Sequence, residues 1–416
     1  MDNIEIANEK AIDRIQESIV HLIRMGKASE EIKILSKGKA LLHSGPPVTY
    51  ENMCSAMKNA IHGAIVYEKW ANNISDAEVL ASSGTIEYYS CNDYGAVGPM
   101  AGIISPSMPV YVFKNIVYNN FSAVTVNEGL GKTLRFGAND ESVIAKLNWI
   151  EKIYAPILKE TLKIMGPLDV SAILAQGLQR GDEAHNRNKA CTSIFIRKIA
   201  PYLVKTSFPK EDISDVLAFL DGNDHTFLNL SMGISKATMD TIKGIPNCSL
   251  VSCMCTNGYE FGIKVSALKD KWITFKSPYA IGNYFPNFTS KDASPVMGDS
   301  YISEASGIGA FAMGCAPGIG QFIGISATEA LEYSKKMYKI TVAEHKRFLI
   351  PSLNYRGVPL GIDIRKVKET RVLPIINTGI AHKNPGVGQI GAGIVYPPIE
   401  CFFEAVNEFN KSLESF

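Results

Sequence analysis

Net charge is almost absent from this sequence. Its 42 lysines and arginines are balanced by 41 aspartates and glutamates, which leaves a formal charge of +1 over 416 residues. Such a balance gives no broad basic surface, so we expect no binding to nucleic acid or to an anionic membrane. Residues 1–5 contain neither a basic nor an apolar segment, and a secretory signal is therefore not expected.

Cysteines are few and scattered for a chain of this length. The eight thiols lack the spacing of a disulfide framework, which favours a reduced, cytoplasmic protein. Cys253 and Cys255 lie two residues apart in a segment with strand character, so we interpret them as core residues rather than metal ligands. We expect no cofactor and no resident metal.

Long apolar runs and common catalytic signatures are missing as well. Residues 305–328 carry no charge, but glycines, Pro317 and Gln321 interrupt the run, so we predict close backbone packing and no membrane span. No P-loop, G-x-S-x-G elbow or H-E-x-x-H helix occurs. Residues 386–391 spell G-x-G-x-x-G without directly following a predicted strand, so we interpret them as a glycine-rich loop and not a dinucleotide site.

The composition and periodicity predict a globular protein of mixed secondary structure. Hydrophobic residues make up 46% of the chain and charged residues 20%, and its length suggests about two or three domains. Asn257-Gly258, between two apolar segments, predicts a β-hairpin. We predict an α+β fold with a mixed multi-domain architecture, in which a small all-helical domain is inserted between two α/β parts. The predicted domains are 1–138 (α/β), 139–210 (helical) and 211–416 (α+β).

One short segment, residues 181–189 (GDEAHNRNK), concentrates charged and hydrogen-bonding side chains. If it is helical, four side chains form one stripe: Asp182, His185, Asn186 and Lys189. Glu183 and Arg187 would form a supporting ion pair beside that stripe. A polar stripe at a helix start is suited to bind an anion or a polarised carbonyl, whereas the alternative is a capped, solvated helix start. Residues 222–225 (GNDH) form a second helix start of the same kind.

Several long segments together resemble one known protein family. These segments are residues 42–47, 95–109, 127–132, 181–188, 222–225 with 229–232, and 377–383. By these motifs the chain is identified as a member of the AllG/YlbE/YahG-like family, whose AllG-type members are a component of the three-part oxamate carbamoyltransferase. The resemblance covers nearly the whole chain. At position 184 the family usually has a cysteine-type residue, so Ala184 argues against a thiol role there.

The resemblance implies a reaction and partners. The reaction is reversible carbamoyl transfer in purine (allantoin) degradation, in which oxalurate and phosphate give oxamate and carbamoyl phosphate. The implied partners are a small anionic amide substrate, phosphate and two other subunits, and we further expect a homo-oligomer. Two alternatives remain open. In the first, the chain is a non-catalytic subunit that binds substrate or scaffolds the others. In the second, it is a hydrolase or lyase of small amide acids, with a metal held by the Asp and His pairs.

The roles of individual residues follow from their chemistry. His185 and His225 are expected to polarise the carbonyl or move a proton, and Asp182 and Asp224 to orient them. Charge and hydrogen bonds for the substrate are expected from a larger set, namely Asn186, Arg187, Asn188, Lys189, Asn223, Asn229, Arg135, Glu128, Asp299, Thr378, His382 and Lys383. Within this set, we expect Arg187 and Lys189 to bind an anionic group.

Overall fold

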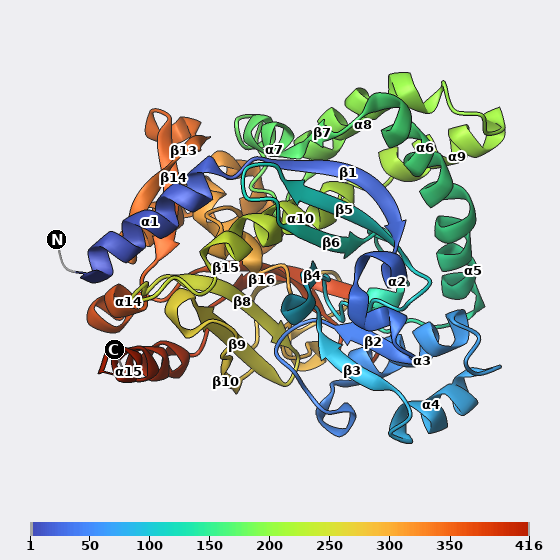
Figure 1. Ribbon diagram of the computed structural model, residues 1–416, viewed down its shortest axis with the longest axis horizontal. Helices are drawn as coiled ribbons and strands as arrows, with labels where there is room; N and C mark the ends of the chain where they lie inside the picture. The colour runs from blue at the N-terminus through green and yellow to red at the C-terminus, as the bar shows by residue number, and fades with distance from the viewer. Residues whose placement is uncertain (1–2, 415–416) are drawn as a thin grey trace.

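A computed structural model describes residues 3–414 and shows an α+β fold with several small sheets (Figure 1). Its α-helices are α1 (Asn3–Glu17), α2 (Ala28–Glu31), α3 (Ser55–Tyr67), α4 (Ile74–Ser82), α5 (Glu141–Trp149), α6 (Ala155–Met165), α7 (Val170–Leu178), α8 (Lys189–Leu203), α9 (Lys210–Asp221), α10 (Thr226–Met239), α11 (Ile302–Ala305), α12 (Gly320–Ile323), α13 (Ala327–Met337), α14 (Ile364–Thr370) and α15 (Ile399–Glu414). Within the described residues, no helix has the length and apolar character needed to cross a membrane.

The strands are distributed over sheets of two to five strands. Their bounds are β1 (Val20–Lys27), β2 (Ala40–His43), β3 (Glu87–Ser90), β4 (Ala96–Val97), β5 (Pro109–Asn115), β6 (Phe121–Thr125), β7 (Leu168–Asp169), β8 (Val251–Asn257), β9 (Glu260–Val265), β10 (Ile273–Lys276), β11 (Ile281–Tyr284), β12 (Met297–Gly298), β13 (Thr341–Ile350), β14 (Arg356–Ile362), β15 (Ile376–Ala381) and β16 (Gln389–Val395). The larger sheets have the orders β4-β6-β5-β1-β7, β10-β9-β8-β12 and β11-β16-β15, and β13-β14 and β2-β3 form pairs.

Helix α10 lies at the centre of the molecule and packs against β5 and β6 (Figure 1). Every residue of this helix is buried. Gly233 makes the close approach possible, because a Cβ there would lie 2.3 Å from Cε2 of Phe113. Ser122 of β6 donates a hydrogen bond to the Gly233 carbonyl at 2.7 Å. The middle of α10 is therefore held closely against the central sheet.

The helices of residues 139–210 line one side of the molecule (Figure 1). Asp140 caps α5 by accepting from the backbone N–H groups of Ser142 and Val143, and Asp169 caps α7 in the same way. The prediction of helices alone is wrong at one point, because β7 pairs with β1. Apolar side chains of α6 and α8 belong to the same hydrophobic cluster as those of β1 and β5. The domain boundaries at 138 and 210 stay a prediction.

The second half of the chain contains the predicted hairpin. Strands β8 and β9 pair antiparallel, and the Asn257 side chain accepts from the N–H groups of Tyr259 and Glu260 at 2.9 and 2.7 Å. Residues 305–328 form short helical turns, and Gly309–Cys315 is buried throughout. The G-x-G-x-x-G sequence covers the turn between β15 and β16 and the start of β16, so it opens a strand rather than a helix.

Candidate functional site

Two polar segments from different parts of the chain meet at a cavity of about 490 Å³. Its polar side is formed by Asn186, Arg187, Asn188, Lys189, Asp224 and His225. Apolar lining comes from Leu130, Phe285, Ile319 and Phe322, and Gln321 and Gln389 also contribute. The starts of α8 and α10 thus come together in space, and the volume is within the usual range of small-molecule sites.

The predicted helical stripe at 182–189 is wrong, because α8 begins only at Lys189. Asp182 precedes the helix and caps it: its Oδ2 accepts from the Cys191 N–H at 2.7 Å. Ala184 has a left-handed backbone with φ +66°, which a continuing helix does not allow. The predicted ion pair between Glu183 and Arg187 is wrong too, since Glu183 Oε1 accepts the Arg187 backbone N–H at 2.6 Å.

Arg187 is the cation whose two terminal nitrogens are left free at the cavity. Its Nε donates to the Gly181 carbonyl at 2.9 Å and forms a long ion pair with Asp182 Oδ1 at 4.0 Å. The two terminal guanidinium nitrogens form no hydrogen bond within residues 3–414. Lys189 differs, because its Nζ is paired with Asp224 Oδ2 at 2.7 Å on the exposed rim. An anion in the cavity would therefore meet Arg187 first.

Unpartnered polar atoms gather at this cavity. Asn186 Nδ2, Asn188 Oδ1 and His225 Nδ1 are buried without a hydrogen-bond partner in the described part of the chain. Asn188 donates through its Nδ2 to the His185 carbonyl at 2.7 Å, so its Oδ1 is the atom left as a free acceptor. Buried polar atoms are nearly always hydrogen-bonded in folded proteins, and such a group of exceptions is typical of a site that binds water or a ligand.

His225 is neutral at physiological pH. Burial, followed by repulsion from Arg135, lowers the pKa of His225 to about 4. A neutral imidazole in the wall of a cavity can donate a hydrogen bond to a carbonyl oxygen or exchange a proton with a ligand.

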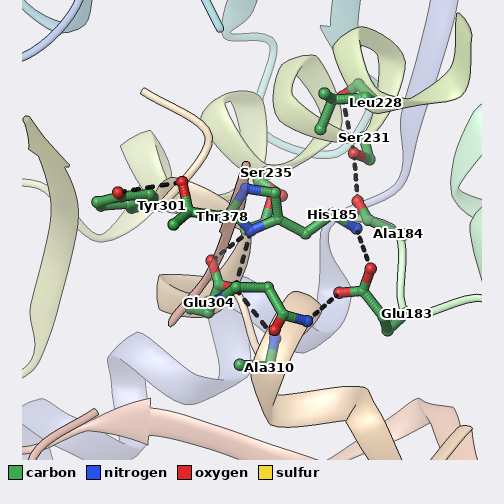
Figure 2. Close-up of polar contacts among 12 residues, drawn as sticks. Glu183, Ala184, His185, Leu228, Ser231, Ser235, Tyr301, Glu304, Ala310 and Thr378 are labelled. Atoms are coloured by element: carbon green, nitrogen blue, oxygen red, sulfur yellow. Dashed lines mark hydrogen bonds and ion pairs between the residues drawn. The ribbon is translucent and has the colours of Figure 1, made fainter. Parts of the chain in front are cut away.

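His185 has a different environment (Figure 2). It is buried, it is not part of the cavity lining, and its Nδ1 lies 2.8 Å from Oε1 of Glu304. The expectation that Asp182 or Asp224 orients a catalytic histidine is therefore wrong for His185. Burial opposes a charged ring, but attraction and a hydrogen bond from Glu304, with help from Glu183, outweigh it and raise the pKa of His185.

Glu304 was missed by sequence reasoning. Its Oε1 also accepts the backbone N–H groups of Ala310 and Asn377, each at 3.0 Å. Glu304 lies next to a long uncharged segment and 119 residues from His185, so no local pattern indicated this pairing. The cavity residues Phe285, Phe322 and Gln321 were missed for the same reason.

Asn223 and Asn229 support the site from behind. Asn223 Nδ2 donates to the Asn127 carbonyl at 3.0 Å, and its Oδ1 accepts the His225 N–H at 3.1 Å. Asn229 Nδ2 donates to the Thr125 carbonyl at 2.7 Å, and its Oδ1 accepts from Asn127 Nδ2 at 2.8 Å. The side-chain amides of both predicted substrate ligands thus form hydrogen bonds within the protein. These bonds connect α10 and the residues before it to the end of β6.

Glu128 and Arg135 line a separate, narrow cavity of about 30 Å³. Glu128 Oε2 accepts the Leu134 N–H at 2.7 Å, and an Arg135 terminal nitrogen donates to the Gly129 carbonyl at 2.6 Å. Burial lowers the pKa of Arg135 to about 10 even though Glu128 attracts its charge. A space of this size holds about one or two water molecules, so it does not hold the expected substrate.

The remaining predicted ligands also lie outside the cavity lining. Asp299 is buried and accepts from the N–H groups of Gly45 and Gly98 at 2.8 and 2.9 Å. Thr378 accepts a hydrogen bond from the Tyr301 hydroxyl at 3.3 Å. His382 and Lys383 lie in the turn after β15, where Lys383 Nζ donates to the Lys291 carbonyl at 2.8 Å. Asp299 and Thr378 therefore connect parts of the interior.

The proposed metal ligands do not converge. Asp182 faces the start of α8, His185 pairs with Glu304, and Asp224 pairs with Lys189. No group of three His, Cys, Asp or Glu side chains suited to a metal ion occurs among residues 3–414. The geometry of these side chains gives the metal-dependent alternative no support.

Comparison with known proteins finds similar sequences over nearly the whole chain. The sequence profile described as oxamate carbamoyltransferase subunit AllG matches residues 86–300. Two Escherichia coli K12 proteins are similar over nearly the whole chain. One is uncharacterized protein YahG, with 41% identity over 97% of this chain and 86% of its own. The other is oxamate carbamoyltransferase subunit AllG, with 40% identity over 98% of both chains.

A crystal structure of a conserved protein of unknown function from Enterococcus faecalis V583 has the same fold. It superposes with a TM-score of 0.97 at 41% identity, covering 99% of this chain and 98% of that one. The long shared motifs, the family profile and the full-length similarity agree, and the chain belongs to the AllG family.

Proposed function

We propose that the cavity binds a small anionic amide of the oxamate or oxalurate type, and that the chain works as a component of an oxamate carbamoyltransferase. The observation that carries this proposal is the set of free groups in one cavity: Arg187, Asn186 Nδ2 and Asn188 Oδ1. An amide offers a carbonyl oxygen to a free N–H donor and an N–H group to a free acceptor. The carboxylate of the ligand is suited to the guanidinium edge.

The proposed reaction requires little from the protein beyond positioning and charge stabilisation. A phosphate oxygen attacks the ureido carbonyl carbon of oxalurate, and the bond from that carbon to the oxamate nitrogen breaks. The nitrogen takes up a proton, which gives oxamate and carbamoyl phosphate. His225, neutral and in the cavity wall, is the group we assign to the oxyanion or to this proton. Arg187 holds the anionic part of the ligand.

Other subunits complete the proposed enzyme. The 40%-identical relative is named as a subunit of oxamate carbamoyltransferase, which supports partners for this chain. The purified chain is expected to bind oxamate by itself, while carbamoyl phosphate is formed only after the partner subunits are added. Isothermal titration with oxamate and with phosphate, followed by a coupled assay with and without partners, tests both statements.

Arg187→Met is the variant that tests the anion site. We expect the Kd for oxamate to rise at least about tenfold, or about 1.4 kcal/mol, because the free guanidinium is lost. Lys189→Met is the matched control, since Lys189 already pairs with Asp224, and its Kd should stay within about threefold of wild type. Equal effects of the two variants, or no oxamate binding by the wild type alone or with its partners, would contradict the proposed site.

A non-catalytic binding subunit is the second candidate, and the position of His185 favours it. This histidine lies outside the cavity lining, so His225 is the one predicted catalytic histidine in the wall. In the reconstituted enzyme, His225→Asn separates the candidates. A loss of kcat of at least about tenfold indicates a catalytic subunit. An unchanged kcat, together with weak substrate binding in Arg187→Met, indicates a subunit that only binds.

A further inference from the structure

The carboxylate of Glu183 is the centre of the loop that carries the cavity residues (Figure 2). Its side chain is fully buried. Oε1 accepts the backbone N–H groups of His185 and Arg187 at 3.2 and 2.6 Å, and Oε2 accepts from Asn377 Nδ2 at 3.0 Å. No Lys or Arg side chain within residues 3–414 forms an ion pair with it. The hydrogen bonds of this buried carboxylate thus come from three donors, and the neighbouring His185 ring attracts its charge.

The same loop is closed around that carboxylate by its own backbone. The Ala184 N–H donates to the Arg187 carbonyl at 3.0 Å, and the Ala184 carbonyl accepts from Ser231 of α10 at 2.8 Å. Because the N–H groups of residues 185 and 187 are directed to Glu183, the side chains of Asn186 and Arg187 are left for the cavity wall. The Gly181 carbonyl then fixes the guanidinium through Nε.

Burying a carboxylate is costly, and here the charge is offset by the neighbouring His185 ring and the three hydrogen bonds, with no Lys or Arg side chain paired to it within the described residues. We infer that Glu183 is a positioning residue: its carboxylate fixes residues 185–187 so that Arg187 presents its free edge to an anionic ligand. This inference rests on the proposed function of the cavity. Glu183 is not part of the cavity lining, so in this role it acts through the backbone of Arg187.

The positioning role has a pH signature in the wild-type protein. The titratable groups facing Glu183 are His185, Glu304, Cys191 and Cys315. Burial raises the pKa of Glu183 to about 7. Protonation removes the negative charge and turns one carboxyl oxygen into an O–H donor, which weakens the bonds from these three donors, so oxamate affinity should fall as the pH is lowered below about 7. An arginine site alone stays charged throughout this range and would show no such loss.

Glu183→Gln tests the inference directly, with Glu68→Gln as the matched control. Glu68 is a half-buried carboxylate that also accepts a backbone N–H, that of Ser107 at 2.6 Å, and it lies outside the cavity lining. At about pH 8, Glu183→Gln should raise the KM and Kd for oxamate at least about tenfold while kcat at saturation stays within about threefold. The part of the wild-type pH dependence that comes from Glu183 should also disappear. Glu68→Gln should change none of these quantities.

Hydrogen exchange of residues 183–188 measures the loop-fixing role of Glu183 in the absence of ligand. The amides of His185 and Arg187 should exchange at least about tenfold faster in Glu183→Gln than in wild type. Unchanged exchange with unchanged affinity would overturn the inference. If wild type binds neither oxamate nor phosphate yet these amides lose protection, the proposed function fails while the loop-fixing role stands. If Glu183→Gln does not fold, the wild-type pH series decides, and affinity that is constant or rises on acidification overturns the inference.

Discussion

At the scale of single residues, His225 and His185 show how surroundings set the charge of two similar rings. Burial, with repulsion from Arg135, lowers the pKa of His225 to about 4. His185 is bonded to Glu304, and its pKa rises. At physiological pH the ring in the cavity wall is therefore neutral, whereas the contact with Glu304 favours the charged form of the buried His185 ring.

His225 should make the stability of the protein depend on pH. Its folded pKa is below the unfolded value of 6.5, so its stabilising contribution is present above about pH 6.5 and is lost as the pH falls towards 4. The non-titrating variant His225→Gln should lose less stability over this window, by up to about 1.4 kcal/mol for each pH unit. Urea unfolding of both proteins at about pH 7 and about pH 4.5 measures the difference. An equal loss in both would contradict a neutral, buried His225.

At the scale of elements, the starts of α8 and α10 are satisfied by the protein itself. Asp182 accepts the Cys191 N–H of α8 at 2.7 Å, and Thr192 Oγ1 accepts the Phe227 N–H of α10 at 3.2 Å. The helix ends were expected to attract the anion through their free N–H groups. Asp182 already places a carboxylate at the start of α8, which is why the proposed function assigns the anion to the Arg187 side chain.

Removing the α8 cap should therefore affect stability. Asp182→Ala should lower the free energy of unfolding by about 2 kcal/mol or more, because it removes a cap and leaves the buried Cys191 N–H unsatisfied. Asp140→Ala is the matched control: it removes the exposed cap of α5 and should cost only about 1 kcal/mol. Chemical denaturation compares the two variants, and an Asp182→Ala effect no larger than that of Asp140→Ala would argue against the buried cap.

At the scale of the whole molecule, one hydrophobic cluster joins the three predicted domains. It contains Leu22 of β1, Ile157 of α6 and Ile263 of β9, all buried. Elements that share a core unfold together unless their shared contacts are weak. The predicted helical domain at 139–210 is thus open to a direct test.

The three tryptophans make that test possible, because Trp70, Trp149 and Trp272 fall one in each predicted domain. Variants that keep a single tryptophan, with the other two replaced by phenylalanine, report each part separately by fluorescence. We expect coincident urea midpoints, since Ile157 and its neighbours pack in the common cluster. A separate transition reported by Trp149 would instead support an independent domain at 139–210. Light scattering on the same samples tests the predicted homo-oligomer.

The sequence by itself determined what depends on neighbours along the chain. The Asn257-Gly258 hairpin and the α+β class were predicted because each is set by hydrogen bonds or periodicity within a few residues, and the caps at Asp140 and Asp169 are equally local. The polar segments 181–189 and 222–225 were also recognised, as were the family motifs.

The tertiary structure alone decided how those segments are used. Glu183 is hydrogen-bonded to Asn377, which lies 194 residues further along the chain, and His185 contacts Glu304, which lies 119 residues further along. These contacts hold residues 181–188 as a loop where a helix was expected. A buried carboxylate must find its hydrogen-bond donors wherever the fold places them, and no local spacing encodes that choice. The tertiary structure likewise places Arg135 in a different cavity from Arg187, and local spacing does not predict that separation.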